Sequence, residues 1–124
     1  MMEMVVDKIT GEDLRNLKDC IEKHGRGLMK RVFPAEGDML FHKTLAQATH
    51  NKMFLQLFDD IYLIIMESVI NVKNYKKEYK EALIFHERIY ESLLKKDKNS
   101  AKEAMKEHIE WLIKIISNSS DKSW

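Results

Sequence analysis

Apolar residues recur every three or four positions along most of the chain, which is the spacing of one face of an α-helix. The pattern predicts helices over about residues 10–31, 33–49, 52–72, 76–95 and 100–117. Thr10 and Asn51 are residue types that cap helix N-termini, and Pro34 suits a first helical turn. Four glycines and one proline punctuate the chain, whereas strand-rich folds need frequent turns. The sequence therefore predicts an all-α fold, an antiparallel helical bundle of about five helices.

The predicted helices make up one domain over residues 10–117, with an N-terminal tail at 1–9 and a C-terminal tail at 118–124. The helix over 52–72 is the most apolar, so we expect it to lie at the centre of the bundle. A polar tract at residues 96–100 separates the last two helices. These two helices are therefore predicted to form an antiparallel hairpin.

The charge balance excludes several classes of function. The chain carries 21 Lys and Arg against 20 Asp and Glu, so its net charge of +1 gives no basic excess for neutralising phosphates.

The cysteine content and the lack of targeting signals bear on the cellular compartment. The single cysteine, Cys20, cannot form a disulfide within the chain, which fits a reducing compartment. No signal peptide or membrane-spanning run is apparent in the sequence. We expect a soluble, cytoplasmic protein that binds neither DNA nor a membrane by itself.

Four of the five histidines fall into two groups. His24 lies in a charged stretch and His50 at a helix junction, so both are expected to be exposed to solvent. His86 and His108 lie on the apolar stripes of their helices, where a buried imidazole needs a partner. Each is eleven residues from Asp97, in the middle of the turn, and a rise of about 1.5 Å per residue puts both about 16 Å from the hairpin end. The two rings should therefore face each other.

A further pair of metal-binding residue types lies in the predicted second helix. Asp38 and His42 are four residues apart, so both side chains reach one face of the helix. Ala82, Ala101 and Ala104 are small residues on the stripes of the two core histidines, and they are expected to leave a cavity around the rings. The four residues Asp38, His42, His86 and His108 thus predict one divalent metal ion. The alternative is a buried network of hydrogen-bonded histidines.

Three imidazole nitrogens and one carboxylate suit a borderline divalent ion, nominally Zn, with Ni, Mn and Fe as other choices. Ser68 interrupts the apolar face of the third predicted helix and is a candidate effector-binding residue. Its hydroxyl has a second explanation, a hydrogen bond to a carbonyl of its own helix.

Several separated motifs match one known family. They are Asp38-x-x-Phe41-His42-x-x-Leu45-Ala46-x-Ala48, then Asn51, His86-x-x-Ile89, and Ala101-x-x-x-Met105-x-x-His108. In this order, over about residues 10–116, the chain resembles the FCD domain, the C-terminal effector-binding domain of GntR-type bacterial transcriptional regulators. The resemblance implies a helical bundle whose central cavity binds a small organic acid. It also implies a divalent ion held by Asp38, His42, His86 and His108.

The chain departs from the family pattern at its start. Nothing in it matches the winged helix-turn-helix domain or the usual first helix of the effector domain, so it looks truncated. We expect a non-enzymatic sensor that binds a carboxylate or hydroxycarboxylate at the metal, with a homodimer left open. A helical metalloenzyme, in which the metal activates water, is one alternative. A metal-free interaction module is the other.

Overall fold

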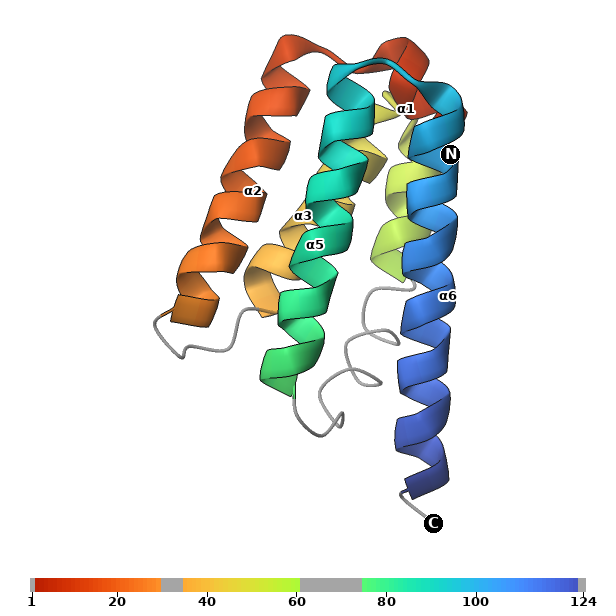
Figure 1. Ribbon diagram of the computed structural model, residues 1–124. Helices are drawn as coiled ribbons and strands as arrows, with labels where there is room; N and C mark the ends of the chain where they lie inside the picture. The colour runs from red at the N-terminus through yellow and green to blue at the C-terminus, as the bar shows by residue number, and fades with distance from the viewer. Residues whose placement is uncertain (1, 30–34, 61–74, 123–124) are drawn as a thin grey trace.

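The computed structural model describes residues 2–29, 35–60 and 75–122, and the regular structure of these residues is helical (Figure 1). The helices are α1 (Met2–Lys8), α2 (Gly11–Met29), α3 (Ala35–Ala48), α5 (Tyr75–Leu94) and α6 (Lys98–Lys122), and residues 52–60 are helical as well. Figure 1 shows α2, α3, α5 and α6 side by side, with α3 running opposite to α2 and α6 opposite to α5. The predicted all-α fold and the α5–α6 hairpin are confirmed.

Both predicted tails differ from what the structure shows. Residues 2–8 form α1, whose Met2, Val5 and Val6 are buried, and this helix packs against α6 and α3. Met2, Val5, Val6 and Ile9 repeat at helical spacing, so a short amphipathic helix was present in the sequence. At the other end α6 continues to Lys122, beyond the predicted end at 117.

The third predicted helix is described only over residues 52–60, and its remainder lies outside the described residues. In this first part Met53 is 71% exposed and Leu57 is 54% exposed. The expected central position is therefore wrong for residues 52–60, because apolar character alone does not decide which face a helix buries.

The core lies between the helices rather than around one of them. Its buried members come from α1, α2, α3, α5 and α6, and the fully buried large side chains include Leu17, Phe41, Leu45, Ile89 and Leu93. Among the described residues, no helix is both long and apolar enough to cross a membrane.

Local hydrogen bonds fix where α2 begins. The Asp13 N–H donates to Thr10 Oγ1 at 3.1 Å, and the Thr10 N–H donates to Asp13 Oδ2 at 3.0 Å. This reciprocal capping box confirms Thr10 as the N-cap. The same Asp13 Oδ2 lies 2.8 Å from His50 Nε2, just past the end of α3, so one carboxylate ties two helix ends together.

Asp13 is expected to make the stability of the bundle fall in acid. Burial raises the pKa of Asp13, but its hydrogen bonds to Thr10 and His50 outweigh burial, and the net pKa is lowered. A carboxylate with a lowered pKa stabilises the fold above its unfolded pKa, and this contribution is lost as the pH falls through the folded value. Asp13→Asn should therefore cost about 1 kcal/mol or less at neutral pH, and the cost should shrink below about pH 4.

Urea unfolding of wild type and Asp13→Asn across this pH range measures the difference. Glu12→Gln is the control, because Glu12 is the exposed neighbour of Asp13 in the first turn of α2. An Asp13→Asn cost that is the same in acid as at neutral pH would contradict the role given to the carboxylate.

Candidate metal centre

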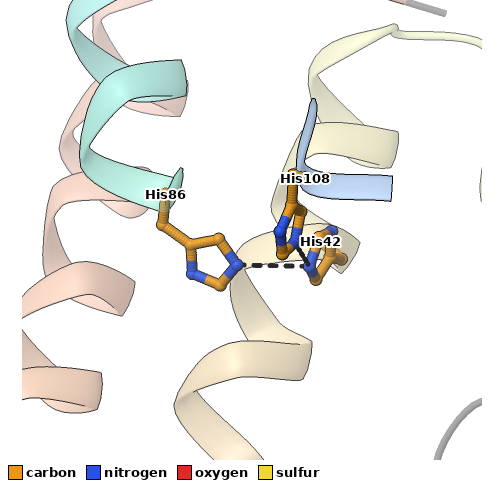
Figure 2. A group of neighbouring side chains, drawn as sticks. All are labelled: His42, His86 and His108. Atoms are coloured by element: carbon orange, nitrogen blue, oxygen red, sulfur yellow. Dashed lines mark hydrogen bonds between the residues drawn. The ribbon is translucent and has the colours of Figure 1, made fainter. Parts of the chain in front are cut away.

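Three imidazoles from three different helices converge on one point. His42 comes from α3, His86 from α5 and His108 from α6 (Figure 2). The Nε2 atoms of His86 and His108 each lie 3.2 Å from His42 Nε2. One ligand nitrogen from each ring lies within 4.8 Å of the others, so the three histidines can form a metal site.

The rings are held in a defined arrangement. His42 and His108 stack with their planes 4° apart and their centroids separated by 5.1 Å. The plane of His86 is almost perpendicular to both, at 83° to His42 and 85° to His108. His86 and His108 are 0% and 2% exposed, and His42 is half-buried. The site is therefore largely closed to water.

The facing of His86 and His108 is the outcome that the hairpin argument predicts. Their ring centroids are 5.1 Å apart, although 22 residues separate them in the chain. Equal distances from one turn bring them to one level of α5 and α6. His42 joins them because α3 also places Phe41 against His86, with the two rings stacked at 4.1 Å and 10°.

Hydrogen bonding alone accounts poorly for three converging Nε2 atoms. In a neutral imidazole Nε2 carries either one hydrogen or one lone pair, so it makes one linear hydrogen bond. His42 Nε2 has two imidazole nitrogens at 3.2 Å. A divalent ion with metal–nitrogen distances of about 2.0–2.1 Å in tetrahedral geometry separates its ligands by about 3.3 Å. The two separations from His42 Nε2 are close to this value, and all three ligand nitrogens lie within 4.8 Å of one another, which is compatible with a shared metal ion.

The surroundings also favour the protonation state that a metal ligand needs. Burial, and then the charge of neighbouring His24, hold the pKa of His86 well below its ordinary value. The ring of His86 is therefore neutral at neutral pH, with a lone pair available without loss of a proton.

Two residues predicted for the site cannot be placed. Asp38 belongs to α3, one turn before His42, but its side chain lies outside the described part of the chain. Ser68 falls in the segment 61–74, which also lies outside it. A carboxylate ligand and an effector-binding hydroxyl therefore remain predictions.

The expected exposure of His24 is wrong. This residue of α2 is 0% exposed, and its ring centroid lies 5.5 Å from that of His86 at an angle of 75°. His24 follows buried Leu17 and Cys20 by seven and four residues, which places it on the apolar stripe of α2. The charged neighbours of His24 in the sequence conceal this periodicity. His50, in contrast, is exposed as predicted.

An aromatic layer next to His108 was not anticipated. Trp111 stacks over His108 with centroids 5.7 Å apart, and Phe85 lies 5.3 Å from the same ring. The Nε1–H of Trp111 donates to Glu81 Oε2 at 2.8 Å, which fastens α6 to α5 beside the site. The spacing of three residues from His108 to Trp111 on one helix is the sequence signal for this contact.

The small residues on the apolar stripes of His86 and His108 are buried, and the cavity expected around the rings stays a prediction. Ala82 is buried, and Ala101 and Ala104 belong to the hydrophobic core cluster, where they pack among apolar side chains. A groove of about 570 Å³ lies elsewhere, between α1 and α6. Its lining residues are Met2, Glu3, Lys102, Met105, Lys106, Ile109 and Glu110.

Comparison with known proteins places the chain in a family. The FCD domain family matches residues 1–110, which include α1. Over 118 residues the chain is 31% identical to the Uxu operon transcriptional regulator of Escherichia coli (strain K12). This alignment covers 87% of the chain and 45% of the regulator, so the chain spans less than half the length of that relative.

Proposed function

The chain belongs to the FCD domain family, and from this premise we propose that it is the effector-binding domain of a GntR-type transcriptional regulator. We further propose that a small carboxylate or hydroxycarboxylate effector binds at a divalent metal ion. The observation that carries the proposal is the convergence of the His42, His86 and His108 Nε2 atoms in a mostly buried site.

The proposed metal ligands are the three histidines together with Asp38, the position that matches the carboxylate ligand of the family. Zinc is the nominal ion, and Ni, Mn and Fe suit the same nitrogen and oxygen donors.

A bound divalent ion would supply positive charge that attracts a carboxylate effector. The chain's own contribution is to hold the rings in place, through Phe41 against His86 and Trp111 against His108.

The partners of two nearby carboxylates, Glu81 and Glu107, favour effector sensing over catalysis. An enzyme that activated metal-bound water would need a carboxylate or imidazole free to take a proton. The Oε2 of Glu81 accepts the Trp111 hydrogen bond, and Glu107, which precedes His108, pairs with Arg88 at 2.6 Å. The carboxylates of Glu81 and Glu107 therefore both have structural partners, which supports binding without turnover.

The test is a thermal-shift screen of the purified chain with and without added Zn, using acetate, lactate, malate and citrate as probes. At least one acid should raise the melting temperature of the metal-loaded protein by roughly 5–10 °C at saturating concentration. The metal-free protein should not respond to that acid.

Two results would speak against the proposal. If none of the acids distinguishes the loaded from the metal-free protein, effector binding at the metal is contradicted. If NMR shows that a bound acid is converted to product, the metalloenzyme alternative replaces the sensor.

A further inference from the structure

His24 is a buried polar residue that the proposed metal set does not use. It lies on α2, a helix that contributes none of the three converging Nε2 atoms. Its side chain occupies a position of the apolar stripe where α2 elsewhere buries Leu17 and Cys20. An imidazole is costly at such a position, because burying a polar ring costs free energy that an aliphatic side chain does not cost.

The contacts of His86 show what His24 touches. The Phe41 ring lies parallel to His86, at 10° and 4.1 Å. The plane of the His24 ring lies at 75° to that of His86, and the centroids of these two rings are 5.5 Å apart. His86 is thus contacted by an aromatic ring from α3 and by an imidazole from α2, while its Nε2 lies 3.2 Å from His42 Nε2. These contacts restrict rotation of the His86 ring about its side-chain bonds.

We propose that His24 is a positioning residue, whose ring holds the His86 imidazole in the orientation that brings its Nε2 to the other two histidines. An edge-to-face contact between rings is directional, whereas an aliphatic side chain fills space without fixing the angle of its neighbour. The inference rests on the proposed function, since it assigns His24 a role in metal binding at that same site. It also explains why α2 buries an imidazole.

The test compares three variants by competition with a chromophoric chelator for Zn. Loss of a residue that orients a metal ligand typically weakens binding about 10–100-fold, so His24→Ala should raise the Kd by about that factor. His24→Phe keeps a ring at the position and should recover most of the affinity. Cys20→Ala is the matched control, because Cys20 is also buried on α2, one turn before His24, and its Sγ contacts Thr44 instead of the site.

A spectroscopic readout separates positioning from a general loss of stability. The visible absorption of the Co²⁺-loaded protein reports ligand geometry, and it should change in His24→Ala but not in Cys20→Ala. In the metal-free protein, the NOE contacts between the His86 and Phe41 rings, which report the orientation of His86, should change in His24→Ala and stay the same in Cys20→Ala.

The outcomes distinguish this inference from the proposed function. If wild type binds Zn and His24→Ala binds it within about twofold of wild type, or if His24→Phe is as weak as His24→Ala, the inference is overturned and the proposed function stands. If wild type binds no metal, the proposed function fails. The NOE contacts between His86 and Phe41 in the metal-free variants then decide whether His24 orients the His86 ring.

Discussion

Removing a bound divalent metal with EDTA is expected to lower the melting temperature of the protein by roughly 10–15 °C. A ligand that binds only the native state stabilises it by about 2.7 kcal/mol at a hundred times its Kd and by about 4.1 kcal/mol at a thousand times. For a domain of this size each kcal/mol corresponds to roughly 4 °C. Binding to the unfolded chain is weak in comparison, because His42, His86 and His108 meet only through the packing of α3, α5 and α6.

The structure indicates why the metal-free protein should be less stable than the metal-bound protein. Without an ion, His42 Nε2 faces two other imidazole nitrogens at 3.2 Å and can form one linear hydrogen bond with them. His86 and His108 are buried, so water has little access to the ring nitrogens that meet there. Bringing these three ring nitrogens together without an ion therefore lowers the free energy of unfolding that helix packing provides.

Circular-dichroism melts before and after chelation, with elemental analysis of the same samples, measure the effect. EDTA saturated beforehand with Zn is the control, and adding Zn back should restore the original melting temperature. An unchanged melting temperature, together with no metal in the purified protein, would identify the cluster as a network of hydrogen-bonded histidines.

Elements that depend on local spacing could be predicted from the sequence. Thr10 caps α2 as predicted, and Asn51 Oδ1 accepts the Met53 N–H at 2.9 Å, as a helix cap does. His86 and His108 face each other because the rise per residue is the same on both sides of the turn. Each of these outcomes depends on geometry within one helix or one hairpin.

Two of the errors, at residues 52–60 and at His24, concern which side of a helix packs against its neighbours. Met53 and Leu57 belong to the most apolar stretch, yet they are exposed, because burial requires a neighbouring helix on that side. The charged neighbours of His24 suggested a surface position, although its spacing from Leu17 and Cys20 was that of a buried residue. The same test of periodicity that singled out His86 and His108 would have found it.

His108→Gln is expected to weaken metal binding by more than about 100-fold, and the burial of His24 decides which histidine can serve as the control. This weakening exceeds the effect of losing a supporting partner, because a ligand nitrogen itself is lost. His24 would be a misleading control, since its ring contacts His86. His50 is the suitable control, because it is exposed, its Nε2 lies 2.8 Å from Asp13 Oδ2, and it is not one of the three clustered histidines.

Glutamine is preferred to alanine at position 108 because Trp111 and Phe85 pack against this ring, and a truncated side chain would leave them facing a cavity. Metal affinity is measured by chelator competition, and far-UV circular dichroism checks that each variant keeps its helices. His50→Ala should bind the metal as wild type does, at a small cost in stability from the lost contact with Asp13. If His108→Gln and His50→Ala changed the affinity equally, the metal would have to bind elsewhere, and the convergence of the three Nε2 atoms would have to be explained by hydrogen bonding alone.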